Sequence, residues 1–129
     1  MVSNSADRSK NNGATVAVKD LVKRYEEGRD SILDGITFAI EPSEFVIVHG
    51  RSGCGKTTLL NILGGLDRPT SGSVSVDGQS MIGLSEDELA RMRLEKIGFV
   101  FQDCNLLMDL TVRENVAVPR SFSKKTVKR

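Results

Sequence analysis

The chain has 129 residues, of which 39% are hydrophobic and 27% are charged. The length fits one small domain or part of a larger one, and the composition is typical of a globular fold rather than a disordered one. No apolar run approaches the roughly 20 residues that cross a bilayer, and no signal peptide is visible at the N-terminus. We therefore expect a cytoplasmic protein that reaches the inner face of the cell membrane only through a partner.

The net charge of +1 is unevenly distributed along the chain. Five of the 18 basic side chains lie in residues 120–129, so the preceding residues carry 13 basic and 17 acidic side chains. A basic end can bind nucleic acid or anionic lipid, but a solvated terminus explains it better, and no nucleic-acid partner is expected. Two cysteines, Cys54 and Cys104, are too few for a disulfide scaffold.

The first part of the chain predicts a disordered lead-in followed by a hairpin. Residues 1–14 are polar and without periodicity. Segments 15–25 and 32–40 then show the alternation of half-buried strands, and the polar residues 26–30 between them predict a turn. We expect the two strands to pair in an antiparallel manner.

The middle of the chain predicts a buried strand, a glycine-rich loop and a helix in succession. Residues 45–48 are apolar on both faces, as in a central parallel strand. The glycine-rich segment 49–55 follows, and an apolar stripe then predicts a helix over 56–64. A turn cluster over 67–72 and a short strand over 73–76 come next, closed by an Asp-Gly turn.

The last third predicts two helices around another strand. Capping-box patterns at 85–88 and 111–114 predict the two helix starts, and the first helix should run to about residue 95. Pro119 is expected to end the second helix. Residues 97–101 predict a second buried strand, and 102–110 a loop.

The glycine-rich loop has the spacing of a P-loop, with Gly50, Gly55, Lys56 and Thr57 in place between an apolar strand and a helix. Glycines let backbone N–H groups approach phosphates, and the helix N-terminus adds a positive dipole end. Lys56 would meet the β- and γ-phosphates, and the Thr57 hydroxyl would ligate Mg²⁺. The predicted nucleotide-binding residues of this segment are Gly50, Ser52, Gly53, Cys54, Gly55, Lys56, Thr57 and Thr58. The loop by itself does not distinguish ATP from GTP.

Several blocks around this loop resemble the ATP-binding subunits of ABC transporters, in particular the lipoprotein-release and macrolide-export branch. The blocks are residues 63–72, 84–90, 97–102 and 110–116. The resemblance implies an α/β fold: an ABC-type P-loop NTPase domain, present as its N-terminal half, with an antiparallel hairpin, part of the parallel core sheet and helices. It implies domain boundaries at 15–119, with 120–129 as a basic tail outside the family pattern.

The resemblance also implies roles for individual residues. Tyr25 is similar to the aromatic that stacks on adenine, which points to ATP. Gln102 is similar to the Q-loop glutamine, which would reach Mg²⁺ or the attacking water and act with Lys56 in catalysis. The loop 102–111 would face a membrane-spanning subunit, and a second ATP-binding subunit would complete the site. The implied activity is ATP hydrolysis that powers lipoprotein release or the export of small molecules or peptides.

The chain departs from the family pattern in several places. Ser43 stands where a glycine is usual, and His49, interpreted as a structural strand-end residue, where a small or apolar residue is usual. The 129 residues contain no ABC signature motif, no Walker B strand ending in Asp-Glu and no switch histidine. We therefore expect ATP binding without turnover. The strands 45–48 and 97–101 are not neighbours in the family's sheet, so we also expect unpaired edges and marginal stability.

Three other functions fit parts of the sequence. The chain could be a non-catalytic remnant that binds nucleotide or the membrane subunit. It could be another P-loop NTPase, a kinase or GTPase, although no guanine-selecting Asn-Lys-x-Asp motif is present. A nucleic-acid-binding ABC ATPase with a basic tail is the third.

Overall fold

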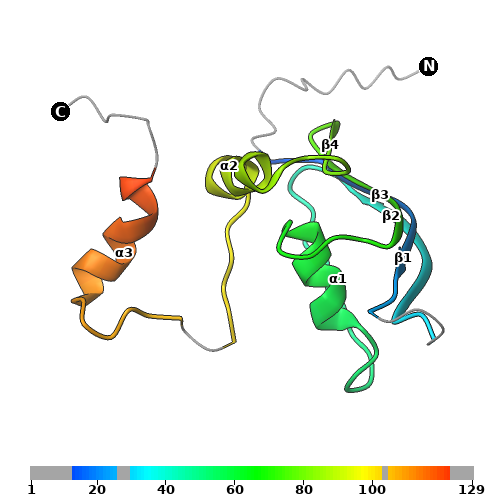
Figure 1. Cartoon of the computed structure of the whole chain (residues 1–129), viewed down its shortest axis with the longest axis horizontal. Coiled ribbons are helices and arrows are strands. Elements are labelled where there is room, and N and C mark those ends of the chain that lie inside the picture. Colours follow the sequence, from blue (N-terminus) through cyan, green and yellow to red (C-terminus); the bar gives the residue numbers. More distant parts are fainter. Residues whose placement is uncertain (1–12, 26–29, 103–104, 123–129) are drawn as a thin grey trace, which may run out of the picture. The chain divides into compact units, whose positions relative to one another are not determined.

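The computed structural model describes residues 13–25, 30–102 and 105–122, which form two compact units divided after Gly83 (Figure 1). Most of the predicted lead-in and most of the basic tail lie outside these residues, as do positions 26–29 of the first turn and 103–104 of the loop after Gln102.

The first unit is built on a four-stranded antiparallel sheet. Its strands are β1 (Val16–Lys23), β2 (Leu33–Ile40), β3 (Ser71–Val76) and β4 (Gln79–Ser80), in the order β2-β1-β3-β4. The antiparallel pairing of β1 with β2 confirms the predicted hairpin. The β3 strand begins two residues earlier than predicted, and β4 was not predicted. Asp77 and Gly78 have φ values of 50° and 72°, the mirror-image turn that joins tightly paired strands.

A β-bulge interrupts β1 at Asp20. Val18 pairs with Phe38 and Leu21 pairs with Ile36, so β1 contains one extra residue in this stretch. Asp20 has a φ of 48°, and its N–H donates to the Thr37 hydroxyl at 2.8 Å. The bulge changes which residues face inward, because an extra residue shifts the two-residue alternation by one position. Val18, Leu21 and Lys23 are buried as a result.

Helix α1 (Lys56–Leu63) completes the first unit and confirms the helix predicted after the glycine-rich loop. Its N-terminal end packs against the start of β2, since a Cβ on Gly55 would lie 2.9 Å from the Ile32 carbonyl oxygen. The helix buries Leu59 and Ile62. The buried apolar side chains of this unit are Val18, Leu21, Leu33, Leu59, Ile62, Val74, Val76 and Met81.

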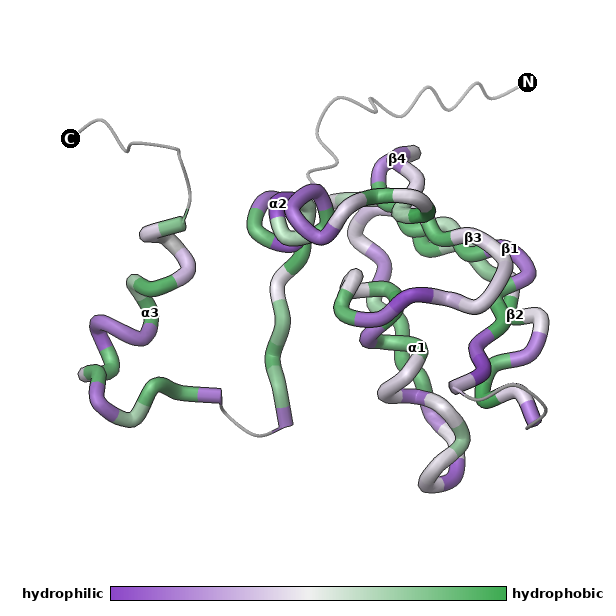
Figure 2. Tube along the Cα trace, viewed as in Figure 1, coloured by the Kyte–Doolittle hydropathy of each residue, from purple (hydrophilic) through white to green (hydrophobic). Residues whose placement is uncertain are grey.

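The predicted strands over 45–48 and 97–101 were wrong, because neither segment is a strand in the structure. Phe45 is 88% exposed and Val100 is fully exposed, and Figure 2 shows the hydrophobic character of the segment that follows α2. An extended segment becomes a strand only when a neighbour supplies ladder hydrogen bonds. The described strands pair only with one another, so the parallel part of the expected sheet is not formed among the described residues.

The second unit contains helices α2 (Glu86–Lys96) and α3 (Val112–Ser121), and both begin with the predicted capping box. Backbone and hydroxyl hydrogen bonds from Ser85 lower the pKa of Glu88. Hydrogen bonds from the Thr111 hydroxyl and backbone lower the pKa of Glu114 in the same way. Local side-chain chemistry is therefore enough to set both helix starts.

The prediction that Pro119 ends the second helix was wrong, since α3 continues to Ser121. Pro119 lacks the N–H that would pair with the Asn115 carbonyl oxygen, so α3 makes its last turn without that hydrogen bond. The Ser121 hydroxyl donates to the Val118 carbonyl oxygen at 2.7 Å and satisfies a carbonyl of this last turn. Within the part of the chain that the structure describes, no helix is both long and apolar enough to cross a membrane.

Candidate nucleotide-binding site

The glycine-rich loop runs into α1 through left-handed backbone conformations. Gly53 has a φ of 78° and Gly55 has a φ of 93°, values that side chains with a Cβ adopt only at a cost. Gly55 is the N-cap of α1 and provides no side-chain acceptor for the first N–H groups of the helix. The N-terminus of α1 therefore points unshielded donors toward the loop, which favours an anion there.

The Lys56 side chain folds back over this loop. Its Nζ donates to the carbonyl oxygens of Gly50 at 3.0 Å and Arg51 at 2.7 Å, and lies 3.7 Å from Cys54 Sγ. The loop thus curves around a single ammonium group. The acceptors around this positive charge are neutral carbonyl oxygens. A negatively charged acceptor, such as a phosphate, binds an ammonium more strongly and could replace them.

The other predicted residues of the segment differ in exposure. Ser52, Gly53, Cys54 and Thr57 are exposed, and Thr58 is half-buried. Cys54 Sγ lies against the backbone of Gly50, where a Cβ would be only 2.7 Å from the sulfur. A side chain at position 50 would therefore have to displace the Cys54 thiol from this place.

A divalent cation fits the donor chemistry of this segment only when phosphates supply most of its ligands. Among the described residues, no group of three or more His, Cys, Asp or Glu side chains could hold a metal. Mg²⁺ in phosphate sites takes one or two protein oxygens and completes its shell with phosphates and water. The exposed Thr57 hydroxyl, next to Lys56 in the first turn of α1, is a donor of this kind.

Tyr25 lies beside α1 in the same unit. Its hydroxyl donates to Asp67 Oδ2 at 2.9 Å and lies 3.5 Å from the Thr58 hydroxyl oxygen. The residue is 58% exposed, so much of its ring is accessible to a ligand. The structure therefore brings together Tyr25 and the P-loop segment, which the sequence places 25 or more residues apart.

Two side chains that hold this tyrosine were not predicted from the sequence. Lys23 Nζ forms an ion pair with Asp67 Oδ1 at 2.7 Å, donates to the Arg68 carbonyl oxygen at 2.8 Å and lies 4.6 Å from the centre of the Tyr25 ring. Asp67 was visible only as a member of the 63–72 block. No local pattern pointed to Lys23, because the bulge at Asp20 decides its direction.

Opposing effects act on the Asp67 carboxyl group. Partial burial by itself would raise the pKa of Asp67, but hydrogen bonds from Lys23, the Arg68 backbone and Tyr25, with the nearby Lys23 charge, outweigh it. The pKa of Asp67 is therefore lower than usual, and the group stays ionised at neutral pH.

Two further residues singled out from the sequence are Gln102 and His49. Gln102 is exposed and belongs to the second unit, at the end of the extended segment 97–101. His49, which we expected at a strand end, is exposed and lies in no strand.

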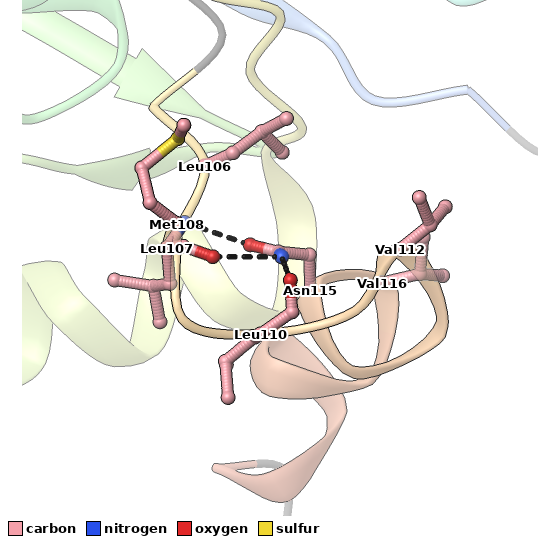
Figure 3. A pocket seen from close by; sticks show the side chains of 7 residues that line it. All are labelled: Leu106, Leu107, Met108, Leu110, Val112, Asn115 and Val116. Carbon is pink, nitrogen blue, oxygen red and sulfur yellow. Dashed lines mark hydrogen bonds between the residues drawn. The ribbon is translucent and has the colours of Figure 1, made fainter.

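The loop after Gln102 forms an apolar pocket with α3 in the second unit (Figure 3). Its volume is about 350 Å³, and it is lined by Leu106, Leu107, Met108, Leu110, Val112, Asn115 and Val116. The Asn115 side chain holds the loop in place: its amide donates to three carbonyl oxygens, and its Oδ1 accepts from the Leu107 N–H at 2.8 Å. A single polar side chain thus fixes a loop whose hydrophobic residues remain accessible.

Comparison with known proteins assigns the chain to a family. The glycine-rich loop at the N-terminus of α1, in one unit with an antiparallel sheet, is typical of a P-loop nucleotide-binding protein. Residues 33–129 match the family described as ABC transporter, and the chain belongs to this family. This confirms the resemblance drawn from the sequence blocks.

Individual relatives agree with this assignment. The chain is 41% identical over 119 residues to the lipoprotein-releasing system ATP-binding protein LolD of Buchnera aphidicola subsp. Schizaphis graminum, a match that covers 91% of this chain and 52% of LolD. It is 46% identical over 110 residues to the macrolide export ATP-binding/permease protein MacB of Syntrophobacter fumaroxidans, covering 84% of this chain and 15% of MacB.

A solved structure shares the fold. The ATP-binding cassette MJ0796, described as a dimeric post-hydrolysis state bound to ADP and Pi, superimposes with a TM-score of 0.81 at 41% identity. The match covers 88% of this chain and 50% of the cassette. The chain therefore spans about half the length of LolD and of this cassette.

Proposed function

We propose that this chain is the ATP-binding part of an ABC-transporter ATPase subunit, and that the segment 50–58 holds the triphosphate of ATP. The observation that supports this most directly is the Lys56 ammonium, enclosed by the carbonyl oxygens of Gly50 and Arg51 at the uncapped N-terminus of α1. An incoming triphosphate would replace these carbonyls as the acceptor of the Lys56 hydrogen bonds.

The position of Tyr25 supports an adenine nucleotide. Its accessible ring lies beside the first turn of α1, and aromatic rings stack on bases. Stacking alone discriminates poorly between bases, so the preference for ATP rests on the family. The description of MJ0796 as bound to ADP and Pi agrees with it.

Mg²⁺ would be held by the Thr57 hydroxyl, by phosphate oxygens and by Gln102. The ion would neutralise the charge of the phosphates. Lys56 would orient the terminal phosphate, and Gln102 would respond to its presence.

In the intact subunit we expect ATP hydrolysis that drives outward transport, as the names of LolD and MacB suggest. The 129 residues of this chain contain no Asp-Glu pair after an apolar strand, and therefore no carboxylate of the kind that serves the family as general base for the attacking water. We expect these residues to bind Mg-ATP and to release phosphate at a negligible rate. A steady-state assay of phosphate release tests this.

The partners we propose are a membrane-spanning subunit at the loop 102–111 and a second ATP-binding subunit. Exposed hydrophobic side chains surround the pocket of this loop, and Met108 is 91% exposed. Such patches mark contact surfaces with other proteins. A membrane-spanning partner would hold the chain at the inner face of the cell membrane. The dimeric form of MJ0796 supports the second subunit.

Calorimetric titration with Mg-ATP tests the nucleotide site. We expect saturable heat for the chain and a loss of affinity of at least tenfold for Lys56→Ala, because a charge-assisted hydrogen bond contributes about 1.5–3 kcal/mol. Lys19→Ala, which removes an exposed lysine from β1, is the control and should bind normally. Equal affinities of the chain and Lys56→Ala would rule out the proposed site.

A further inference from the structure

Among the residues that the structure describes, Lys23 is the buried charged residue of the first unit, with 9% of the residue's surface exposed. A buried ammonium is costly unless it is paired and hydrogen-bonded. Lys23 meets this requirement with Asp67 Oδ1 at 2.7 Å and the Arg68 carbonyl oxygen at 2.8 Å. Aliphatic residues fill such positions at lower cost, so a contribution to stability does not by itself explain this ion pair.

Both members of the pair contact Tyr25. The Lys23 ammonium lies 4.6 Å from the centre of the Tyr25 ring and covers one of its faces. The second oxygen of the Asp67 carboxylate accepts the Tyr25 hydroxyl at 2.9 Å. One carboxylate therefore holds the cation above the ring with one oxygen and the end of the ring with the other.

This arrangement restrains an otherwise exposed aromatic residue. Tyr25 is 58% exposed, and without these contacts its ring would be free to change rotamer. With one face covered by Lys23, a base can stack only on the opposite face. The hydroxyl, near the Thr58 hydroxyl at 3.5 Å, directs that ring to the first turn of α1.

We propose that Lys23 and Asp67 are positioning residues for the nucleotide base, which hold Tyr25 in the orientation that stacks on adenine. The inference rests on the proposed function of the segment 50–58. The pair itself does not touch the nucleotide. It removes the entropy cost of ordering Tyr25 on binding, a cost that corresponds to roughly a three- to tenfold change in affinity.

The experiment compares two ligands, Mg-ATP and magnesium tripolyphosphate, by calorimetry on the full 129-residue chain. Tripolyphosphate has no base, so only Mg-ATP depends on Tyr25. We expect Lys23→Met and Asp67→Asn to lower the affinity for Mg-ATP about three- to tenfold and to leave the affinity for tripolyphosphate unchanged. The matched controls are Lys19→Met and Asp34→Asn, exposed residues of β1 and β2, which should change neither affinity.

A double-mutant cycle separates positioning from a direct effect. In a Tyr25→Leu background, Asp67→Asn should cause no further loss of Mg-ATP affinity, because the residue it positions is gone. Tyr25→Phe gives a test that leaves the Lys23–Asp67 ion pair in place. It removes only the hydroxyl contact, so it should lower the affinity for Mg-ATP less than Asp67→Asn does and leave the affinity for tripolyphosphate unchanged.

Fluorescence gives an independent readout, because Tyr25 is the only tyrosine of the chain and there is no tryptophan. Mg-ATP should quench the Tyr25 emission of the chain, and saturating Mg-ATP should quench that of Asp67→Asn less. The positioning role would be overturned if the variants lost the same affinity for Mg-ATP and for tripolyphosphate. It would also be overturned if the affinity losses of Tyr25→Leu and Asp67→Asn were additive. In either case the phosphate site would stand. Failure of the unaltered chain to bind either ligand would overturn the proposed function itself.

Discussion

The bulge in β1 predicts a specific intolerance at Gly72 on the neighbouring strand β3. Gly72 has a φ of 84°, and a Cβ built on it would lie 2.3 Å from the Asp20 carbonyl oxygen. Two costs therefore add up in Gly72→Ala. The left-handed conformation costs about 1–2 kcal/mol for a residue with a Cβ. The overlap with backbone costs about 1–3 kcal/mol more, because a carbonyl fixed in the bulge cannot move aside without disturbing the ladder.

Gly78 offers a matched control for this experiment. Its φ is 72°, but a Cβ added at that position would meet no atom within 4 Å. Gly78→Ala therefore has the conformational cost without the overlap. The gain from restricting the unfolded chain is the same in both variants, so it cancels in the comparison. We expect Gly72→Ala to lower the free energy of unfolding by about 1–3 kcal/mol more than Gly78→Ala.

Urea unfolding followed by far-ultraviolet circular dichroism measures this difference. A loss of this size is a large share of the stability of a small domain, so it should be visible as a clear shift in the midpoint. Equal losses in Gly72→Ala and Gly78→Ala would show that the bulge does not lie against β3, and the explanation of Lys23 burial would fail with it.

Single positions give three further predictions. Ser43 has a φ of 69°, and Ser43→Gly should stabilise the chain by about 0.5–1 kcal/mol in urea unfolding, because relief of left-handed strain outweighs the added freedom of the unfolded chain; a lower midpoint would contradict this. Alkylation of Cys54, exposed in the P-loop segment and 3.7 Å from the Lys56 ammonium, should block nucleotide binding, and Mg-ATP should slow the reaction. Mass spectrometry separates Cys54 from Cys104, and unchanged affinity after complete modification of Cys54 would refute it. The pKa of Asp67 is lowered on folding, so its ionised form stabilises the protein at pH values above about 4, and this stabilisation is lost as the pH falls through the folded-state value. The stability difference between the chain and Asp67→Asn should therefore be constant from neutral pH to about pH 5 and decline below it, whereas a difference that grows on acidification would contradict the sign.

Local chemistry made much of this molecule predictable from the sequence. The alternation in β1 and β2 predicted the hairpin, and the two capping boxes predicted where α2 and α3 begin. The P-loop pattern predicted the loop and the helix after it, because glycine spacing and the helix start are determined within a few residues. The roles of Lys56, Thr57, Tyr25 and Gln102 in nucleotide binding stay predictions that the experiments above test.

Non-local pairing made the rest unpredictable. Residues 45–48 are as apolar as a central strand, yet a strand exists only where another strand supplies hydrogen bonds, and none among the described residues does. The burial of Lys23 was likewise not predicted, because one extra residue at Asp20 reverses which side chains of β1 point inward.

The amino-acid order alone thus determined the glycine loop, the helix caps and the hairpin, because each depends on contacts between residues close together in the chain. Only the tertiary structure decided that Lys23 is buried, that it pairs with Asp67 and that both hold Tyr25 beside α1. The contacts of Lys23 with Asp67 and of Tyr25 with Asp67 and Thr58 join positions far apart in the chain, and a one-residue bulge, which no local pattern of β1 announces, sets their geometry.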